Sequence, residues 1–262
     1  MTAPLRDHKS RPPVSCYIRT LNEERKIGAV LAAAGRVARD IHVVDSGSTD
    51  HTLEIAEAAG AHIIHQPWLG SGLQKRVGEE ACTHDWLLDL DADEVLSDAL
   101  IDEIHALFAD GAPQERAFKL PLVTTPAFGK PWYNGDVAYR AKLYDRRKVR
   151  MPESKIWDQL GIKRERLPRL KGALLHHAIA DMAQVVARVN KAAKTRGGAK
   201  NRPFGMVLLR LYFGFPVYFF KSFVLRRRFM SGPYGFSLAF TLAFGRWLQD
   251  VRMYERHRER TG

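Results

Sequence analysis

The chain has 262 residues, which is enough for one full domain with an appendage but short for two. Hydrophobic residues make up 45% and charged residues 27%, an ordinary globular mixture that excludes a disordered or fibrous protein. Two cysteines exclude a disulfide scaffold and a cysteine-rich zinc site, and the first residues lack the apolar core of a signal peptide, so we expect a protein of the reducing cytoplasm.

The net charge of +12 belongs to the C-terminal part of the chain. From Arg188 onward sixteen Lys and Arg stand against three acidic residues, a net charge of +13, whereas residues 1–187 carry −1. This asymmetry predicts a basic interaction segment attached to a neutral domain. We therefore expect a flexible N-terminus over 1–13, a globular domain over 14–187 and a basic, apolar, helical tail over 188–262.

The first half of the chain alternates between strand-like and helix-like segments. Short apolar runs predict four strands, over residues 15–21, 41–45, 61–66 and 86–94. Helical patterns with plausible caps predict four helices, over residues 23–34, 48–60, 73–82 and 97–109. Repeated strand–helix units are typical of a doubly wound parallel sheet, in which ligands bind beyond the C-terminal ends of the strands.

Polar residues gather where these strands end, at residues 20–24, at Asp45 and at 91–94. Asp45 either caps the following helix or accepts hydrogen bonds from a base or ribose. No glycine-rich dinucleotide fingerprint follows the first strand and no P-loop occurs in the sequence, which argues against both phosphate-binding motifs. Beyond residue 116, aromatic residues, prolines and an Asn134-Gly135 turn predict strands and loops along one edge of the sheet.

Four carboxylates crowd the end of the predicted strand over 86–94, namely Asp89, Asp91, Asp93 and Glu94. They repel one another unless a counter-charge is present. A divalent cation, Mg²⁺ or Mn²⁺, would supply that charge and bridge to substrate phosphates. In an extended strand Asp91 and Asp93 share a face, so these two are the predicted ligands. Capping of the next helix explains Glu94 and Asp89 equally well.

Three motifs occur in this order: a strand ending T-L-N-E-E, a strand ending V-V-D-S-G-S-T-D and a strand ending L-D-A-D-E. Together they resemble family 2 glycosyltransferases, and more narrowly the lipopolysaccharide-core β-glucosyltransferase-like branch, in which a basic, apolar segment follows the catalytic domain. The resemblance covers residues 15–196 well and the tail loosely. It implies an α/β fold of the GT-A type, with a Rossmann-like, mostly parallel sheet flanked by helices, a nucleotide-sugar half over 14–110 and an acceptor half over 111–187.

The resemblance also implies a UDP-sugar donor bound at the strand ends. Thr20 and Glu23 would lie under the nucleotide, and Asp45 would contact the uracil. Asp91 would reach the ribose or the metal, and Asp93 would ligate a divalent cation, Mg²⁺ or Mn²⁺, on the diphosphate.

Other side chains have two readings each. Lys75 either neutralises phosphate or belongs to a solvated helix face. Trp132 and Tyr133 suit a wall on which a sugar stacks, or an ordinary core. His176 and His177 are neighbours that point to opposite faces of a strand, so a structural role is favoured over joint metal binding.

Inversion at an anomeric carbon requires a carboxylate base that takes the proton of the incoming hydroxyl. In the family branch that this chain resembles, the base follows a hairpin strand, which here reads K-L-Y-D-R-R. By that resemblance, the later segment K-I-W-D-Q-L has Asp158 at the position of the carboxylate. Trp157 stands where the family often has histidine, a departure from its pattern. Glu153 is the competing base and Asp136 the third, and each is otherwise an exposed loop acid.

The tail joins an apolar, aromatic run over 203–225 to three arginines at 226–228. The run is nearly long enough to cross a bilayer, but Arg210 and Lys221 interrupt it and Pro216 would kink it. Aromatic residues flanked by basic ones are typical of a segment that lies in the headgroup region of an anionic leaflet.

We therefore predict that residues 200–250 attach the protein peripherally to an anionic membrane surface, the cytoplasmic face of a bacterial inner membrane. Packed helices or a dimer interface come second, and a true membrane span third. Basic residues alone would also fit nucleic acid, but a nucleic-acid groove does not need the apolar residues beside them.

With the resemblance, the sequence predicts an inverting, metal-assisted transferase that moves a hexose from a UDP-sugar to a lipid-linked or lipopolysaccharide-core acceptor. The alternative is a nucleotidyltransferase that processes nucleotide sugars, which also uses a metal and acidic strand ends. That class expects a glycine-rich, basic signature near the N-terminus, and T-L-N-E-E-R-K-I-G does not supply it.

Overall fold

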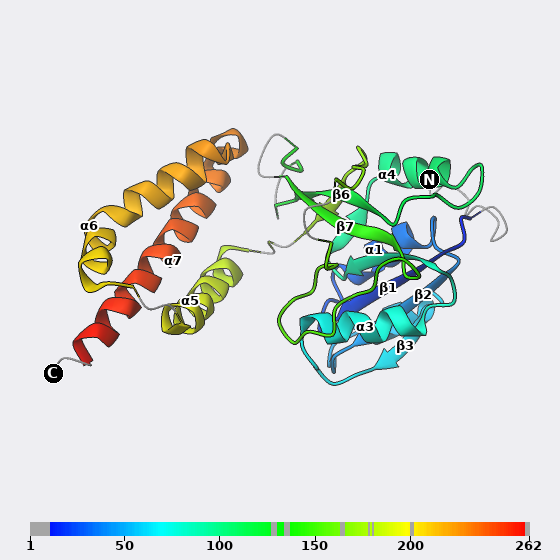
Figure 1. Ribbon diagram of the computed structural model, residues 1–262, viewed down its shortest axis with the longest axis horizontal. Coiled ribbons are helices and arrows are strands. Elements are labelled where there is room, and N and C mark those ends of the chain that lie inside the picture. The colour runs from blue at the N-terminus through cyan, green and yellow to red at the C-terminus, as the bar shows by residue number, and fades with distance from the viewer. Residues whose placement is uncertain are drawn as a thin grey trace. The chain divides into compact units, whose positions relative to one another are not determined.

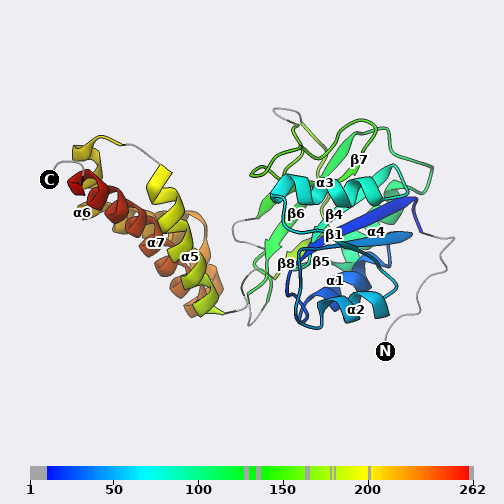
Figure 2. The same ribbon diagram turned by 90° about the horizontal axis from the view of Figure 1, so that it is seen from below.

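The computed structural model describes residues 11–126, 130–133, 137–162, 166–177, 179, 181–199 and 202–259, and only the backbone of 195–199. The chain divides into two compact units (Figures 1 and 2). Unit 1 comprises residues 1–123 and 138–177, and unit 2 comprises residues 124–137 and 178–262. The predicted boundary after residue 187 falls inside the first helix of unit 2.

Unit 1 is built on an eight-stranded sheet with the order β3-β2-β1-β4-β7-β6-β8-β5. The strands are β1 (Val14–Thr20), β2 (Asp40–Asp45), β3 (His62–His65), β4 (Trp86–Asp91), β5 (Glu94–Leu96), β6 (Ala117–Thr124), β7 (Ala138–Asp145) and β8 (Leu174–His176). The pairs β1–β2, β1–β4 and β2–β3 are parallel. The pairs β4–β7, β6–β7 and β5–β8 are antiparallel. The expected α/β fold, a sheet flanked by helices, is confirmed, and the sheet is mixed rather than mostly parallel.

Helices cover both faces of this sheet, α3 on one and α1 and α2 on the other (Figure 2). The helices of unit 1 are α1 (Ile27–Ala34), α2 (Thr52–Ala58), α3 (Ser71–Ala81) and α4 (Asp98–Leu107). The larger core cluster packs Ile27 of α1 against Ile18 and Leu88 of the sheet. A smaller cluster on the α3 side contains Tyr17 and Leu87, the alternate residues of the same two strands.

The four strands and four helices predicted in the first half of the chain are present, with shifted ends. Helix α1 begins at Ile27 rather than residue 23, because the intervening residues form a turn in which the amides of Lys26 and Ile27 donate to the Glu23 carbonyl. The single strand predicted over 86–94 is wrong: β4 ends at Asp91, a turn follows, and β5 starts at Glu94.

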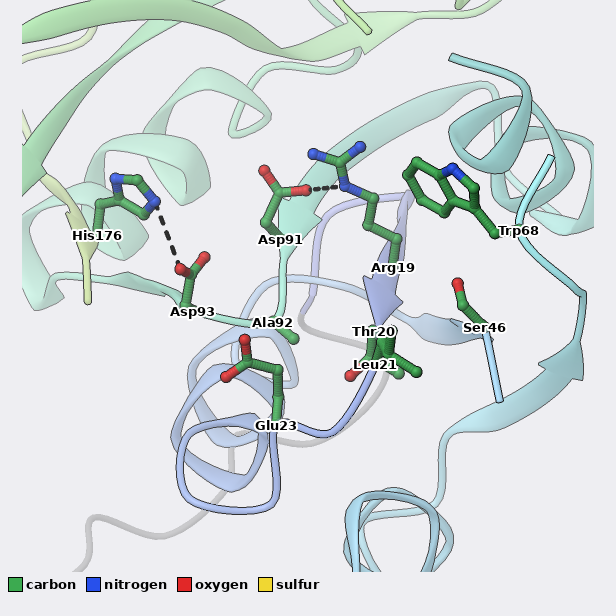
Figure 3. A pocket seen from close by; sticks show the side chains of 10 residues that line it. All are labelled: Arg19, Thr20, Leu21, Glu23, Ser46, Trp68, Asp91, Ala92, Asp93 and His176. Carbon is green, nitrogen blue, oxygen red and sulfur yellow. Dashed lines mark hydrogen bonds and ion pairs between the residues drawn. The ribbon is translucent and has the colours of Figure 1, made fainter. Parts of the chain in front are cut away.

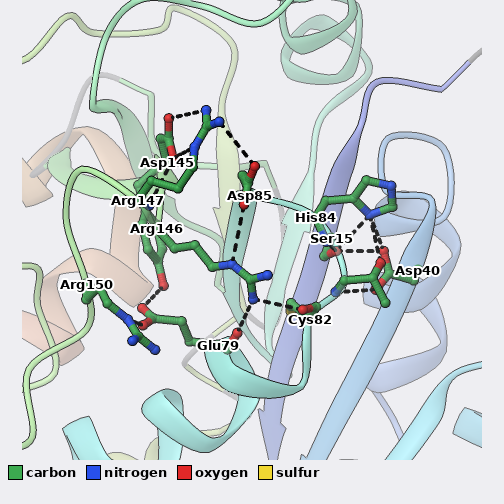
Figure 4. Close-up of polar contacts among 12 residues, drawn as sticks. Ser15, Asp40, Glu79, Cys82, His84, Asp85, Asp145, Arg146, Arg147 and Arg150 are labelled. Carbon is green, nitrogen blue, oxygen red and sulfur yellow. Dashed lines mark hydrogen bonds and ion pairs between the residues drawn. The ribbon is translucent and has the colours of Figure 1, made fainter.

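Polar contacts close the sheet at the amino ends of its parallel strands (Figure 4). Arg146 donates to the carbonyls of Glu79 and Cys82, at 3.1 and 2.8 Å, and so satisfies carbonyls at the end of α3. Asp40 accepts a hydrogen bond from Ser15 at 2.6 Å. These contacts are structural, because they lie away from the strand ends where ligands bind.

Unit 2 is helical, as predicted for the tail. It contains α5 (Met182–Ala199), α6 (Phe204–Phe220) and α7 (Gly232–Glu259), with a π-helix, η2 (Lys221–Leu225), and a 3₁₀-helix, η3 (Arg228–Ser231), between the last two. Helix α7 packs against both α5 and α6. A Cβ atom on Gly245 of α7 would lie 2.1 Å from Val189 of α5, so glycine permits this close approach.

Two segments named in the sequence analysis, the N-terminus and a predicted turn, are wholly or partly outside the described residues. Residues 1–10 and the Asn134-Gly135 turn lie outside them. Arg11, within the N-terminus that we expected to be flexible, is only 8% exposed and donates to the carbonyl of Ala38 at 3.3 Å. The described end of that segment is therefore packed.

Candidate active site

A pocket of about 350 Å³ lies at the C-terminal ends of β1, β2 and β4 (Figure 3). Its lining residues come from those strand ends, from the loop after β3 and from β8. They are Arg19, Thr20, Leu21, Glu23, Ser46, Trp68, Asp91, Ala92, Asp93 and His176. Four residues predicted for the site thus face one cavity, namely Thr20, Glu23, Asp91 and Asp93.

The alternation of side chains along β1 and β4 decides which charges meet below the pocket. Arg19 is two residues beyond Tyr17, and Asp89 and Asp91 are two and four beyond Leu87, so all three point to the face that α3 covers. Lys75 of α3 reaches Asp89 at 2.8 Å, and both side chains are 3% exposed. Burial of these charges is tolerable because they are paired.

Three cations surround Asp91. Its carboxylate lies 2.6 Å from Arg19, 3.4 Å from Lys142 and 3.7 Å from Lys75. Burial alone would raise the pKa of Asp91, but Lys142, Lys75 and Arg19 together hold it well below its usual range. Side chains therefore supply much of the positive counter-charge that we expected from a metal ion.

Glu94 is a buried member of the charge network around Asp91. Lys142 Nζ lies 2.5 Å from Glu94 Oε2, which also accepts from the amide of Asp91 at 2.9 Å. Burial raises the pKa of Glu94 to about 7, although Lys142 opposes the shift. Helix α4 is capped instead by Ser97, whose side chain accepts from the amide of Leu100.

Asp93 lines the pocket from the turn between β4 and β5, so it does not share the extended geometry of Asp91. Its partner is His176 at the end of β8, with 3.5 Å between the carboxylate and Nε2. Burial raises the pKa of Asp93, but the contact with His176 lowers it overall. The same contact raises the pKa of His176 against the effect of burial.

Asp93 and His176 are suitable donors for a divalent cation. No cluster of three or more His, Cys, Asp or Glu side chains that could hold a metal occurs among the residues described. Cations in nucleotide sites usually take one or two protein carboxylates and complete their shell with phosphates and water. The carboxylate of Asp93 and the imidazole of His176 fit such a cation, whereas Asp91 is already held by Arg19.

Thr20 and Glu23 approach the pocket from β1 and the turn after it. The buried hydroxyl of Thr20 has no hydrogen-bond partner among the described residues. Glu23 forms an ion pair with Lys26 at 2.9 Å, and its amide donates to Thr52. Thr20 thus carries unused hydrogen-bonding capacity at the pocket wall.

Two predicted nucleotide contacts lie elsewhere. Asp45 is 1% exposed, and its carboxylate accepts from the amide of Gly47 at 2.9 Å and from the amide and hydroxyl of Ser48. It organises its own turn and is not among the lining residues. It does not cap the following helix, because α2 begins at Thr52 and has no side-chain cap. Lys75 is buried against Asp89 and influences the pocket through Asp91 rather than by facing it.

An exposed indole forms one wall of the pocket. Trp68 is 57% exposed and lies on the side of Ser46, whereas Asp93 and His176 lie on the opposite side (Figure 3). The loop that carries Trp68 is fixed by Gln74, which is fully buried. The Gln74 side chain donates to the carbonyl of Gln66 at 2.9 Å and to Ser46 at 3.1 Å, and accepts from the amide of Leu69.

The start of α3 is tied to the loop that carries the predicted bases. The amides of Ser71 and Gly72 donate to the carbonyls of Lys155 and Ser154, each at 2.9 Å, and Leu73 also donates to Ser154. Helix amides that would otherwise lack partners are thereby satisfied. A Cβ atom on Gly72 would lie 2.3 Å from a carbonyl oxygen of this loop, so the contact requires glycine.

The two described candidate bases differ in their surroundings. Asp158 lies 3.1 Å from Arg19, a residue that lines the pocket, and its side chain is 32% exposed. The Glu153 side chain is 70% exposed and pairs with Arg76 at 3.3 Å. Asp136 lies outside the described residues. The geometry favours Asp158 because it is linked to the pocket.

The predicted sugar wall of Trp132 and Tyr133 lies in unit 2. Trp132 packs against the cluster formed by Ile179, Val185 and Leu238, in the ordinary core role. Tyr133 is exposed.

Sequence reasoning did not identify Arg19, Lys142 and Trp68, and it favoured a structural role for His176. A basic residue two positions beyond a buried aromatic on β1 was the available signal for Arg19, because alternation places it on the α3 face. Lys142 and His176 come from strands far along the chain, and no local pattern connects them with the acidic motif.

Comparisons with known proteins identify the family of this chain. The sequence profile of glycosyl transferase family 2 matches residues 15–114. An uncharacterized glycosyltransferase of Rickettsia bellii is 31% identical over 259 residues, which cover 92% of this chain and 86% of that protein. The lipopolysaccharide core biosynthesis glycosyltransferase LpsC of Rhizobium meliloti is 28% identical over 257 residues, covering 94% of this chain and 93% of LpsC.

Among solved structures, glucosyl-3-phosphoglycerate synthase of Mycobacterium tuberculosis, in complex with Mn²⁺, UDP and glucosyl-3-phosphoglycerate, is similar with a TM-score of 0.36 and 22% identity. The match covers 45% of this chain and 46% of that one, and so partial a likeness carries no functional argument. The relatives that match over most of their length do carry one. The chain belongs to glycosyl transferase family 2 and is a glycosyltransferase.

Proposed function

We propose that the protein transfers a hexose, with inversion, from a UDP-sugar to a lipid-linked or lipopolysaccharide-core acceptor. The observation that carries the proposal is the pocket at the ends of β1, β2 and β4, where Thr20, Asp91 and Asp93 gather in a chain of this family. Ligands of open α/β sheets bind at this place. The name of the Rhizobium relative supports a lipopolysaccharide-core acceptor.

The two ends of the pocket suggest how the donor lies. Asp93 and His176 would hold the divalent cation at one end, which places the diphosphate there. The uracil ring of UDP would then stack on Trp68 at the other end, within reach of Ser46 and the unpartnered hydroxyl of Thr20. When bound, the cation neutralises charge that develops on the departing nucleoside diphosphate.

Asp158 is the proposed base. It would accept the proton of the acceptor hydroxyl as that oxygen attacks the anomeric carbon and the bond to UDP breaks. Arg19 contacts this carboxylate and that of Asp91, at 3.1 and 2.6 Å, and so orients Asp158 toward the pocket edge. Arg19 is thus a positioning residue for the base.

We place the enzyme peripherally on the cytoplasmic face of an inner membrane, where a lipid-linked acceptor would be accessible. Unit 2 would provide the attachment. The exposed apolar surface of this unit favours a membrane over nucleic acid, because nucleic-acid surfaces attract charge rather than apolar side chains.

The test is sugar transfer by the full chain with Mn²⁺ and a panel of labelled UDP-, GDP- and dTDP-sugars, using truncated lipopolysaccharide as acceptor. We expect label to enter the glycolipid from a UDP-hexose, with the product anomer opposite to that of the donor. Transfer from GDP- or dTDP-sugars alone would contradict the donor assignment, and a product of unchanged anomeric configuration would contradict inversion.

A further inference from the structure

Helix α6 presents an apolar face that the described residues of unit 2 leave exposed. Its exposed large apolar residues recur at helical spacing, at Met206, Leu209, Phe213, Val217 and Phe220. The segment Phe204–Leu225, α6 with η2, is long and apolar enough to cross a membrane, yet only 17% of its most apolar window is buried. A helix in a soluble core would be mostly buried, whereas this face is left open to contact with another apolar surface.

Helix α7 carries a row of half-exposed phenylalanines beside α6. Phe236, Phe240 and Phe244 are 49%, 47% and 42% exposed and recur every four residues. The first two pack edge-to-face against Phe219 and Phe215 of α6. The two helices therefore share one aromatic seam whose outer edge stays accessible.

One of the two charges that interrupt the apolar run, Arg210, is neutralised inside the helix pair. Arg210 donates to Asp250 of α7 at 3.0 Å, and Tyr218 donates to the other oxygen of the same carboxylate at 2.9 Å. Asp250 is fully buried. Arg210 thus faces its partner helix and does not oppose contact of the outer face with lipid.

Exposed charge lies instead where α6 turns into α7. Arg226 and Arg227 are exposed in the turn between η2 and η3, and Arg227 adopts a left-handed backbone with φ 53°. Exposed Leu225, Phe229 and Met230 stand directly beside them. Apolar side chains next to arginines match the boundary between acyl chains and anionic headgroups.

We propose that the outer face of α6, the phenylalanine seam of α7 and the arginine turn at residues 226–228 form one surface that lies in the plane of an anionic bilayer leaflet. The apolar face would enter the acyl boundary and the arginines would bind lipid phosphates. This deepens the membrane location proposed above, and it is independent of the donor pocket in unit 1.

The test is co-sedimentation of the full chain with vesicles of phosphatidylethanolamine and phosphatidylglycerol, compared with pure phosphatidylcholine. We expect binding to the anionic vesicles that weakens as salt rises. Leu209→Ser/Phe213→Ser and Arg226→Glu/Arg227→Glu should each weaken it about tenfold or more. UDP affinity, measured in parallel, should stay unchanged, so that failure here is distinguishable from failure of the donor site.

Matched controls separate this surface from general charge or hydrophobicity. Val186→Ser removes another exposed apolar side chain, on α5. Arg246→Glu/Arg252→Glu makes the same charge change about 20 Å or more along α7 from the turn. Both should bind vesicles like the unmodified chain. Equal losses in the control and test variants would overturn the proposal.

Two other outcomes would also overturn it. Retention in the membrane pellet after alkaline extraction would show a span rather than in-plane attachment. A dimer that forms without vesicles and dissociates in Leu209→Ser/Phe213→Ser would identify a second copy as the occupant of this face.

Discussion

Arg19 and Asp158 form an ion pair of 3.1 Å between the first strand and a loop 139 residues later. The same guanidinium lies 2.6 Å from Asp91 at the edge of the pocket. One side chain therefore joins the acidic strand end to the carboxylate that we propose as the base. The pKa of Arg19 is raised despite its burial, because Asp91, Asp89 and Asp158 surround it.

Asp158→Asn should abolish sugar transfer while UDP affinity remains near that of the unmodified enzyme. The amide cannot accept the acceptor's proton, and loss of a general base typically costs 10²- to 10⁴-fold in rate. Turnover and UDP titration calorimetry measure the two quantities separately. Glu153→Gln is the matched control, because Glu153 is largely exposed and pairs with Arg76; if it alone stops transfer, the base is Glu153.

Asp93→Ala should remove the dependence of UDP binding on Mn²⁺. In the unmodified chain we expect UDP to bind at least about tenfold more tightly with Mn²⁺ than with a chelator, because the cation links the carboxylate to the diphosphate. Calorimetric titration measures both affinities. Asp98→Asn, a change at an exposed surface ion pair, should behave as the unmodified chain does. Metal-independent binding in the unmodified chain would contradict the cation site.

Trp68→Ala should weaken UDP binding by about tenfold, since stacking of a base on an aromatic side chain contributes ~1–3 kcal/mol. Trp68→Phe should restore most of the affinity because it keeps an aromatic face. Titration calorimetry with UDP and with uridine alone measures the effect. If the alanine variant binds uridine as tightly as the unmodified chain does, the uracil ring lies elsewhere in the pocket.

Gly72→Ala should destabilise the protein by about 2 kcal/mol and reduce transfer. The new methyl would overlap backbone carbonyls of the loop over residues 152–157, which cannot retreat without moving Asp158. Urea unfolding and turnover measure the two effects. Gly161→Ala, where a Cβ atom meets nothing within 4 Å, should leave both unchanged. A fully active Gly72→Ala enzyme would show that the loop position does not matter.

The stability contribution of Asp40 should depend on pH. Burial raises the pKa of this carboxyl, but hydrogen bonds from His42, Ser15 and His84 outweigh it and hold the pKa well below its usual range. A lowered folded pKa means that the contribution is present above the unfolded value of about 3.9 and is lost as pH falls below it. Urea unfolding of Asp40→Asn should thus differ most from the unmodified chain at neutral pH, and the difference should shrink toward pH ~3. A constant difference would contradict the assignment.

Local patterns predicted the parallel half of unit 1 because each element there carries its own signal. The strand around Ile18 is apolar on both faces, and α4 begins at a serine cap. The C-terminal edge of the sheet could be located in the same way, which brought Thr20, Asp91 and Asp93 to one edge, although the exact end of β4 was missed. The strand order β4-β7-β6-β8-β5 could not be predicted from local patterns, because antiparallel pairing of distant segments is set by tertiary packing.

The charge balance of the site was equally invisible to local patterns. The sequence shows four acids together, from which a metal was inferred as their counter-charge. Lys75, Lys142 and Arg19 supply much of that charge from a helix and two other strands. Asp45 illustrates the same limit, because the turn residues that occupy its carboxylate are within three positions but their amides are directed at it only by the folded turn.

The amides that begin α3 hold the segment around Ser154 through three peptide hydrogen bonds. A flap that swings open would have to break all three together, so this segment behaves as part of the rigid frame and not as a gate. Under the proposed mechanism, the proton acceptor is preset when the chain folds, and an incoming glycan has to fit itself to a fixed point.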